Sequence, residues 1–162
     1  MINRLHFCLL LSACAWLSGC ASPGYFQPTP IATPGNAMVY LYRPAASNPG
    51  AKPLYFSYPE VMIDDTSYGF LRYDHYLAIE LPPGKHQFRL TGLTKDAKWE
   101  PEDIEHSIDL APGQSAFLDF SVEYNTAEMG LLNPGPKYII RLNQVPESSA
   151  VYQIRATTKT AE

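Results

Sequence analysis

The residues best able to do covalent chemistry in this sequence are its cysteines, Cys8, Cys14 and Cys20. A thiolate can act as a nucleophile or a metal ligand. A disulfide framework would spread its cysteines through the folded body, and a zinc site would pair them with further ligands at short, regular spacing. All the cysteines here lie within residues 1–20 and match neither pattern. The start of the chain therefore needs another explanation.

Residues 1–19 have the organisation of an export signal. Arg4 supplies a positive charge, and an apolar run from Phe7 to Leu17 follows it. This run is shorter than the roughly 20 residues that a membrane-spanning helix needs. Small residues and then a cysteine follow the run. These features predict a signal that directs export and does not itself remain as a membrane span.

The segment Leu17-Ser18-Gly19-Cys20 resembles the lipobox of bacterial lipoproteins. The resemblance implies that the Cys20 thiol receives a diacylglycerol, that the signal is cut before Cys20, and that the new amine is acylated. Two or more acyl chains give stable membrane anchoring. Because no aspartate follows Cys20, the resemblance favours the outer membrane, with the protein facing the periplasm. The alternatives are an inner-membrane anchor, or an ordinary secretory signal with a chance cysteine.

Other reactive residues form no catalytic or metal-binding motif. The sequence has no nucleophile elbow, and no phosphate-binding loop, dinucleotide fingerprint or paired zinc histidines. The histidines beyond the signal could form a metal site only if the fold gathered them, and turn or strand-surface positions are the simpler interpretation: His75, His86 and His106. Asp64, Asp65 and Asp74 lack the spacing of a calcium loop and suit turns. We therefore expect no enzyme activity, cofactor or metal.

Aromatic residues are the most informative remaining group. Aromatic side chains suit strands and pack across them, so most of them are expected in the core or in cross-strand pairs. Any that stay exposed could bind another envelope protein, because tyrosine is enriched at interfaces, or could stack on the sugar rings of peptidoglycan. The candidate binding residues are Tyr40, Tyr42, Tyr68, Tyr73 and Tyr76.

The composition describes one acidic domain. The chain has 162 residues, with 12 basic and 16 acidic side chains and a net charge of −4. This length suits a single domain, and the charge argues against nucleic acid as a partner. Residues 21–36 are rich in proline and uncharged, which is typical of an extended linker, although Tyr25, Phe26 and Ile31 could dock it on the domain. The expected parts are a signal (1–19), an acylated cysteine with its linker (20–36) and a folded domain (37–162).

The pattern of the folded domain predicts β-structure, because apolar residues recur at every second position. The runs with this pattern are 38–43, 61–63, 77–81, 86–90, 104–110, 118–122, 137–143 and 150–155. Turns at Pro82-Pro83-Gly84 and at Ala111-Pro112-Gly113-Gln114 predict two β-hairpins. About eight short antiparallel strands predict an all-β, immunoglobulin-like sandwich. A partly open barrel is the alternative.

The order and spacing of these segments resemble a bacterial lipoprotein family known as domain of unknown function 2846. The matching segments are Val39-Tyr40-Leu41-Tyr42-Arg43-Pro44, Val61-Met62-Ile63-Asp64 with Gly69, Leu77 to Leu81 with Pro82-Pro83-Gly84-Lys85-His86, and Leu110 with Pro112-Gly113-Gln114. The central hairpin is also similar to PEGA-type β-domains of envelope proteins. The resemblance implies an envelope lipoprotein and supplies no catalytic residue. We expect a non-catalytic structural, adaptor or protein-interaction role, with glycan binding as the alternative and a metal-dependent enzyme as the less favoured one.

Overall fold

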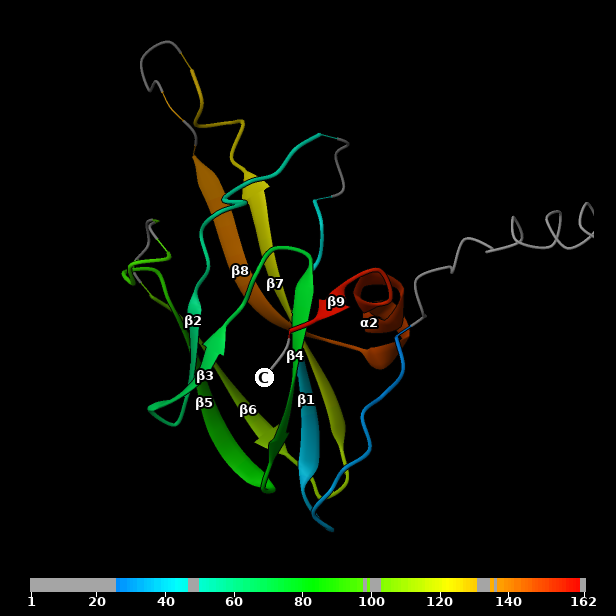
Figure 1. Ribbon diagram of the computed structural model, residues 1–162. Coiled ribbons are helices and arrows are strands. Elements are labelled where there is room, and N and C mark those ends of the chain that lie inside the picture. Colours follow the sequence, from blue (N-terminus) through cyan, green and yellow to red (C-terminus); the bar gives the residue numbers. More distant parts are fainter. Residues whose placement is uncertain are drawn as a thin grey trace, which may run out of the picture.

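The folded chain is a sandwich of two β-sheets (Figure 1). The computed structural model describes residues 26–46, 50–97, 99, 103–130, 135 and 137–160. Nine strands and one helix lie in these ranges. This confirms the predicted all-β sandwich, since the described strands form two separate layers and not a partly open barrel. Within the same ranges, no helix has both the length and the apolarity to cross a bilayer.

The larger sheet has five strands in the order β8-β7-β1-β4-β9. Their bounds are β8 (Tyr138–Val145), β7 (Ser115–Tyr124), β1 (Ala37–Arg43), β4 (His75–Leu81) and β9 (Thr158–Lys159). β1 runs parallel to β7, and β4 runs parallel to β9. The pairs β1–β4 and β7–β8 are antiparallel. The parallel pairs were not expected from the sequence, because parallel neighbours need long connections that local patterns do not reveal.

The smaller sheet has four strands in the order β3-β2-β5-β6. Their bounds are β3 (Thr66–Phe70), β2 (Glu60–Ile63), β5 (Gly84–Thr91) and β6 (Asp103–Leu110). β2 and β3 form a tight hairpin through Asp64 and Asp65, whose φ angles are 49° and 63°. Two successive positive φ angles are typical of the type I′ turn, and aspartate tolerates them better than most residues.

The two proline–glycine turns are corners between the sheets, so the prediction of two hairpins is wrong. Pro82 and Pro83 connect β4 in the larger sheet to β5 in the smaller one, and Ala111 to Gln114 connect β6 to β7. Both corners lie at the lower end of the molecule in Figure 1. The alternation of apolar residues reports which face of a strand is buried, but it does not report the strand's hydrogen-bonding partner.

The last predicted strand, 150–155, is instead part of a helix, α2 (Glu147–Ile154). The carbonyl of Pro146 accepts hydrogen bonds from the N–H groups of Ser149 and Ala150, both at 3.0 Å. Ala150 and Ile154 are fully buried. Residues four apart share one face of a helix, so this spacing lets α2 pack on a sheet. Because the segment is short, its apolar residues fit both periods and the sequence pattern did not distinguish them.

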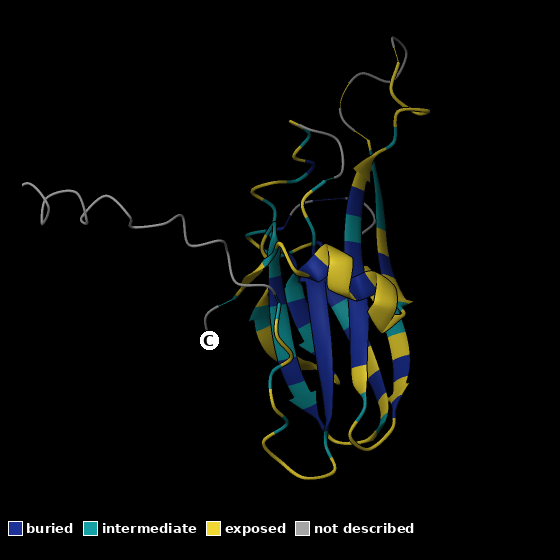
Figure 2. Cartoon of the chain, turned by 90° about the vertical axis from the view of Figure 1, so that its right-hand side faces the viewer, coloured by how far each residue is buried: buried dark blue, intermediate teal, exposed yellow. Residues whose placement is uncertain are grey.

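The larger sheet is covered on both faces. Its inner face packs against the smaller sheet in the main core, which includes Val39 and Leu41. Its outer face carries a second group of buried residues, called here the outer cluster: Met38, Tyr40, Tyr42, Tyr76, Phe117, Ala150 and Ile154. Figure 2 shows α2 lying across this outer face. All of β1 is buried as a result, since its alternate side chains enter the two clusters.

Part of the predicted linker packs on the domain. The ring of Phe26 lies 5.0–6.2 Å from three aromatic rings of the outer cluster. The Glu80 carboxylate accepts hydrogen bonds from the backbone N–H groups of Ala32 and Thr33, both at 2.8 Å. These bonds lower the pKa of Glu80 to about 2. Residues 26–36 therefore pack on the folded body, as in the docked alternative, and β1 begins directly after them at Ala37.

Candidate functional site

The candidate tyrosines do not form one exposed surface. Tyr40 and Tyr42 are fully buried and Tyr76 is 9% exposed, all on the outer face of the larger sheet. α2 and the segment around Phe26 cover that face. The prediction of a binding surface is therefore wrong for these three residues, because the alternation along β1 and β4 did not show that the second face also has a cover.

The other two candidates, Tyr68 and Tyr73, are accessible. Tyr68 lies on the edge strand β3 and is 37% exposed. Tyr73 is partly exposed, and its hydroxyl accepts a hydrogen bond from the N–H of Ala46 at 2.9 Å. Its ring centroid is 5.0 Å from that of Tyr55. Tyr73 thus supports a group of aromatic residues that the sequence analysis did not select as a site.

A buried arginine holds the loop that carries this group. Arg43, at the end of β1, is 1% exposed. Its guanidinium donates hydrogen bonds to the carbonyls of Pro53 and Leu54, both at 2.9 Å, and of Ser57 at 2.8 Å. It also lies 5.4 Å from the centre of the Tyr73 ring. Burial lowers the pKa of Arg43 to about 10, so the group stays charged at neutral pH.

These bonds place two aromatic side chains at the surface. Tyr55 and Phe56 follow Leu54, which has a positive φ of 51°. Their ring centroids are 4.8 Å apart in an edge-to-face arrangement. Phe56 is 81% exposed. Exposure of so large an apolar side chain on a loop fixed by a buried arginine is the most unusual surface feature of the described chain.

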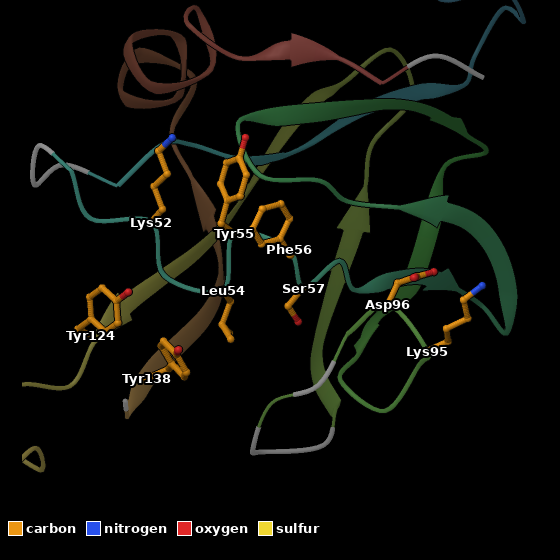
Figure 3. A pocket seen from close by; sticks show the side chains of 9 residues that line it. All are labelled: Lys52, Leu54, Tyr55, Phe56, Ser57, Lys95, Asp96, Tyr124 and Tyr138. Atoms are coloured by element: carbon orange, nitrogen blue, oxygen red, sulfur yellow. The ribbon is translucent and has the colours of Figure 1, made fainter. Parts of the chain in front are cut away.

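Beside these rings is an open hollow of about 820 Å³, called here the aromatic cleft (Figure 3). Its lining residues are Lys52, Leu54, Tyr55, Phe56, Ser57, Lys95, Asp96, Tyr124 and Tyr138. The segment 52–57 supplies one part of the lining, and Figure 3 shows Lys95 and Asp96 on the opposite side from Tyr124. The Tyr58 N–H donates to the Asp96 carbonyl at 2.5 Å and so joins two of the contributing loops.

The ends of β7 and β8 supply the remaining rings of the aromatic cleft. Tyr124 and Tyr138 are register partners at the ends of these strands, and their ring centroids are 5.5 Å apart. Neither tyrosine was selected from the sequence, because the contact depends on long-range strand pairing. The proline- and glycine-rich run 49–53 was an available signal for the other side, since aromatic residues that follow a loop have no strand neighbours to cover them.

The histidines that the structure describes, His75, His86 and His106, do not gather into a metal site. His86 places Nδ1 2.6 Å from Oδ2 of Asp64 and Nε2 2.9 Å from the Pro82 carbonyl. Burial lowers the pKa of His86, but the bonds to Asp64 and Pro82 outweigh it, and the net shift is upward. Among the described residues, no three His, Cys, Asp or Glu side chains lie close enough together to hold a metal ion. His86 instead ties the Asp64 turn to the corner between β4 and β5.

The aromatic cleft offers chemistry suited to binding. Its rings can contact apolar or planar groups, and Lys52 and Lys95 can attract anionic ones. The predicted lipid attachment site, with Leu17, Ser18, Gly19 and Cys20, lies outside the described residues. Comparison of the chain with protein-family models, with curated proteins and with solved structures finds no match.

Proposed function

We propose that this protein is a non-catalytic, lipid-anchored binding protein of the bacterial cell envelope, and that its aromatic cleft holds a partner protein. The observation that carries the proposal is the 81% exposure of Phe56 on a loop fixed by Arg43. Contiguous exposed apolar surface marks interaction sites, and the exposed ring of Phe56 adjoins that of Tyr55, 4.8 Å away between ring centroids. The proposal assigns a structural or adaptor role to the domain.

The aromatic cleft has the features of an interface anchor. Binding energy concentrates in a few aromatic or arginine side chains that enter a pocket on the partner. A loop that is already ordered loses little entropy when it binds, and the hydrogen bonds of Arg43 order this one. Lys52 and Lys95 line the same cleft. The partner should therefore present an apolar pocket flanked by acidic groups.

The proposed partner contact can be tested by crosslinking in intact cells. A photoreactive residue at position 56 should give a discrete crosslinked product with an envelope protein, because Phe56 is the most exposed ring of the cleft. In the unlabelled protein, Phe56→Ala should weaken that interaction about tenfold or more, which is typical of an anchor residue. The readout is the crosslinked product for the photoreactive protein and co-purification of the same partner for Phe56→Ala, with the partner identified by mass spectrometry in both cases.

The matched control places the photoreactive residue at Asp109, an exposed position on β6. Equal products from positions 56 and 109, or none from position 56, would reject the protein partner. A second candidate is a glycan, favoured by the Tyr124–Tyr138 ring pair beside the lysines. Retention on purified sacculi that Tyr138→Ala abolishes would support the glycan and replace the protein partner.

The membrane anchor is a separate part of the proposal. It is supported by the resemblance of Leu17-Ser18-Gly19-Cys20 to a lipobox, and it places the domain at the periplasmic face of the outer membrane. Cys20→Ala should abolish acyl labelling and release the protein from the membrane fraction, because no other residue would carry the lipid. Labelling with a palmitate analogue measures this. Unchanged labelling of the Cys20→Ala variant would disprove the assignment, and Cys14→Ala is the matched control.

A further inference from the structure

A second cavity, of about 810 Å³ and called here the Asp119 cavity, lies near α2. Like the aromatic cleft, it reaches the end of β7 at Tyr124. Part of its lining is apolar, from the loop that follows β1 and from β7: Pro44, Ala45, Ala46, Ala51, Pro53 and Val122. Another part is acidic, from Asp74, Asp119 and Glu123. No lysine, arginine or histidine is among its described lining residues. The cavity therefore combines hydrocarbon walls with negative charge.

Asp119 is the decisive member of this lining. It lies in the middle of β7, beside Tyr42 of β1, and only 9% of it is exposed. Its Oδ1 atom is buried and has no hydrogen-bond partner among the described residues. A buried carboxylate without a partner carries a large desolvation cost. A positive group bound at this cavity wall would offset that cost through a charge-assisted hydrogen bond.

The charged groups around Asp119 leave it without a counter-ion. Glu123, on the same strand, repels it and is itself paired with Arg141 of β8, at 3.4 Å. From β1, the Tyr42 hydroxyl donates to Gln153 of α2 at 2.5 Å and not to Asp119.

The remaining charges near the cavity are also engaged elsewhere. The Arg155 guanidinium lies 5.5 Å from the centre of the Tyr152 ring. The charge of His75 acts on Asp74. No cationic side chain of the described chain thus forms an ion pair with Asp119.

We propose that this cavity binds a primary alkylammonium group, with Asp119 as its counter-ion. An ammonium group donates three hydrogen bonds and forms strong charge-assisted bonds to a carboxylate. The alanine and proline side chains of the loop after β1 match the methylene chain that carries it. A divalent metal fits less well, because the described residues bring no three ligating side chains together. The proposal goes beyond the partner contact at the aromatic cleft, with which this cavity shares only Tyr124.

The test is a titration of the full chain, held in a non-ionic detergent, with n-butylammonium followed by NMR. Binding should saturate with a dissociation constant on the order of 1–10 mM, as for a small ligand. Shifted signals should include Ser121 and Thr126, which line the cavity. Asp119→Asn keeps the side-chain shape but removes the charge, and it should weaken binding about tenfold or more. Asp109→Asn, at an exposed position on β6, should leave binding unchanged.

Two further probes, the uncharged 1-butanol and the calcium ion, test whether the cavity selects an ammonium group. 1-Butanol has a similar alkyl chain and no charge, so equal affinity for butanol would overturn the proposal. Calcium that shifts the same signals while n-butylammonium does not would also overturn it. Binding of n-butylammonium that Asp119→Asn does not weaken would show that the carboxylate is not the counter-ion. None of these results depends on Phe56, so failure here is distinguishable from failure of the proposed partner contact.

The alkylammonium group could belong to a free amine or to a lysine side chain of a peptide. A third titration uses the tripeptide Ala-Lys-Ala with both ends blocked, and a fourth uses the same tripeptide acetylated at Nζ. Tighter binding of the lysine peptide than of n-butylammonium would identify a peptide as the ligand. Tighter binding of n-butylammonium would identify a free amine. Equal binding of the acetylated peptide would reject the ammonium group altogether.

Discussion

Replacing Arg43 with methionine is expected to lower the free energy of unfolding by about 3 kcal/mol or more. Methionine can fill much of the space, but it removes the guanidinium that donates to the carbonyls of Pro53, Leu54 and Ser57. The Leu54 carbonyl keeps a second donor, the N–H of Ser57 at 3.0 Å. Unpaired buried carbonyls cost about 1–3 kcal/mol each. Urea denaturation of the full chain at pH 7 measures the change. Arg43→Lys should be intermediate, because one ammonium group cannot reproduce the planar fork of arginine.

The same substitution should also disturb the aromatic cleft. Loss of the Arg43 bonds frees the segment that carries Tyr55 and Phe56, so the crosslink from position 56 should fall even where the domain remains folded. Arg72→Met is the matched control, since Arg72 is exposed and its guanidinium lies 5.8 Å from the centre of the Tyr58 ring. A loss of less than 1 kcal/mol in Arg43→Met, similar to that in Arg72→Met, would show that the loop does not depend on the buried arginine.

Replacing Asp119 with asparagine is expected to stabilise the protein at pH 8 by about 2 kcal/mol, and by little at pH 4. Burial, with a smaller contribution from Glu123, raises the pKa of Asp119 to about 6. An unfolded aspartate titrates near 3.9. Between these values the native state binds more protons than the unfolded state, so the contribution of Asp119 to stability falls as the pH rises from about 4 to about 6. If the whole difference between these two pKa values acts on stability, it corresponds to about 3 kcal/mol of unfolding free energy. This is the upper bound for the stabilisation by Asp119→Asn.

The measurement compares thermal unfolding of Asp119→Asn and of the unsubstituted chain at pH 4 and pH 8. The difference between the two proteins is the useful quantity, because Glu80 and His86 titrate alike in both. Asp109→Asn should show no such pH-dependent difference. An equal effect of Asp119→Asn at both pH values would mean that the carboxylate is not destabilised when it is ionised. Asp119→Asn is also the variant that should weaken n-butylammonium binding, so one substitution tests both the cost of the buried carboxylate and its role as a counter-ion.

Most of the strands could be predicted from the sequence, and so could the class of fold. The alternation of Val39 and Leu41 with Tyr40 and Tyr42 reports a strand with different neighbours on its two faces. This information is local, because side chains in a strand point alternately to opposite sides. The turn at Asp64 and Asp65 was equally readable, since short polar residues favour such positions. The lipid attachment at Cys20 stays a prediction of the sequence alone.

The tertiary structure decided what each strand faces and where a binding site can form. The sequence pattern left Tyr40 available for binding, whereas in the folded protein α2 and Phe26 cover it. The aromatic cleft needs Phe56 from one loop and Tyr138 from β8, and the Asp119 cavity needs the loop after β1 to meet α2. These contacts join residues far apart in the chain. Local periodicity carries no information about such contacts, because they follow from strand order and packing and not from the spacing of neighbouring side chains.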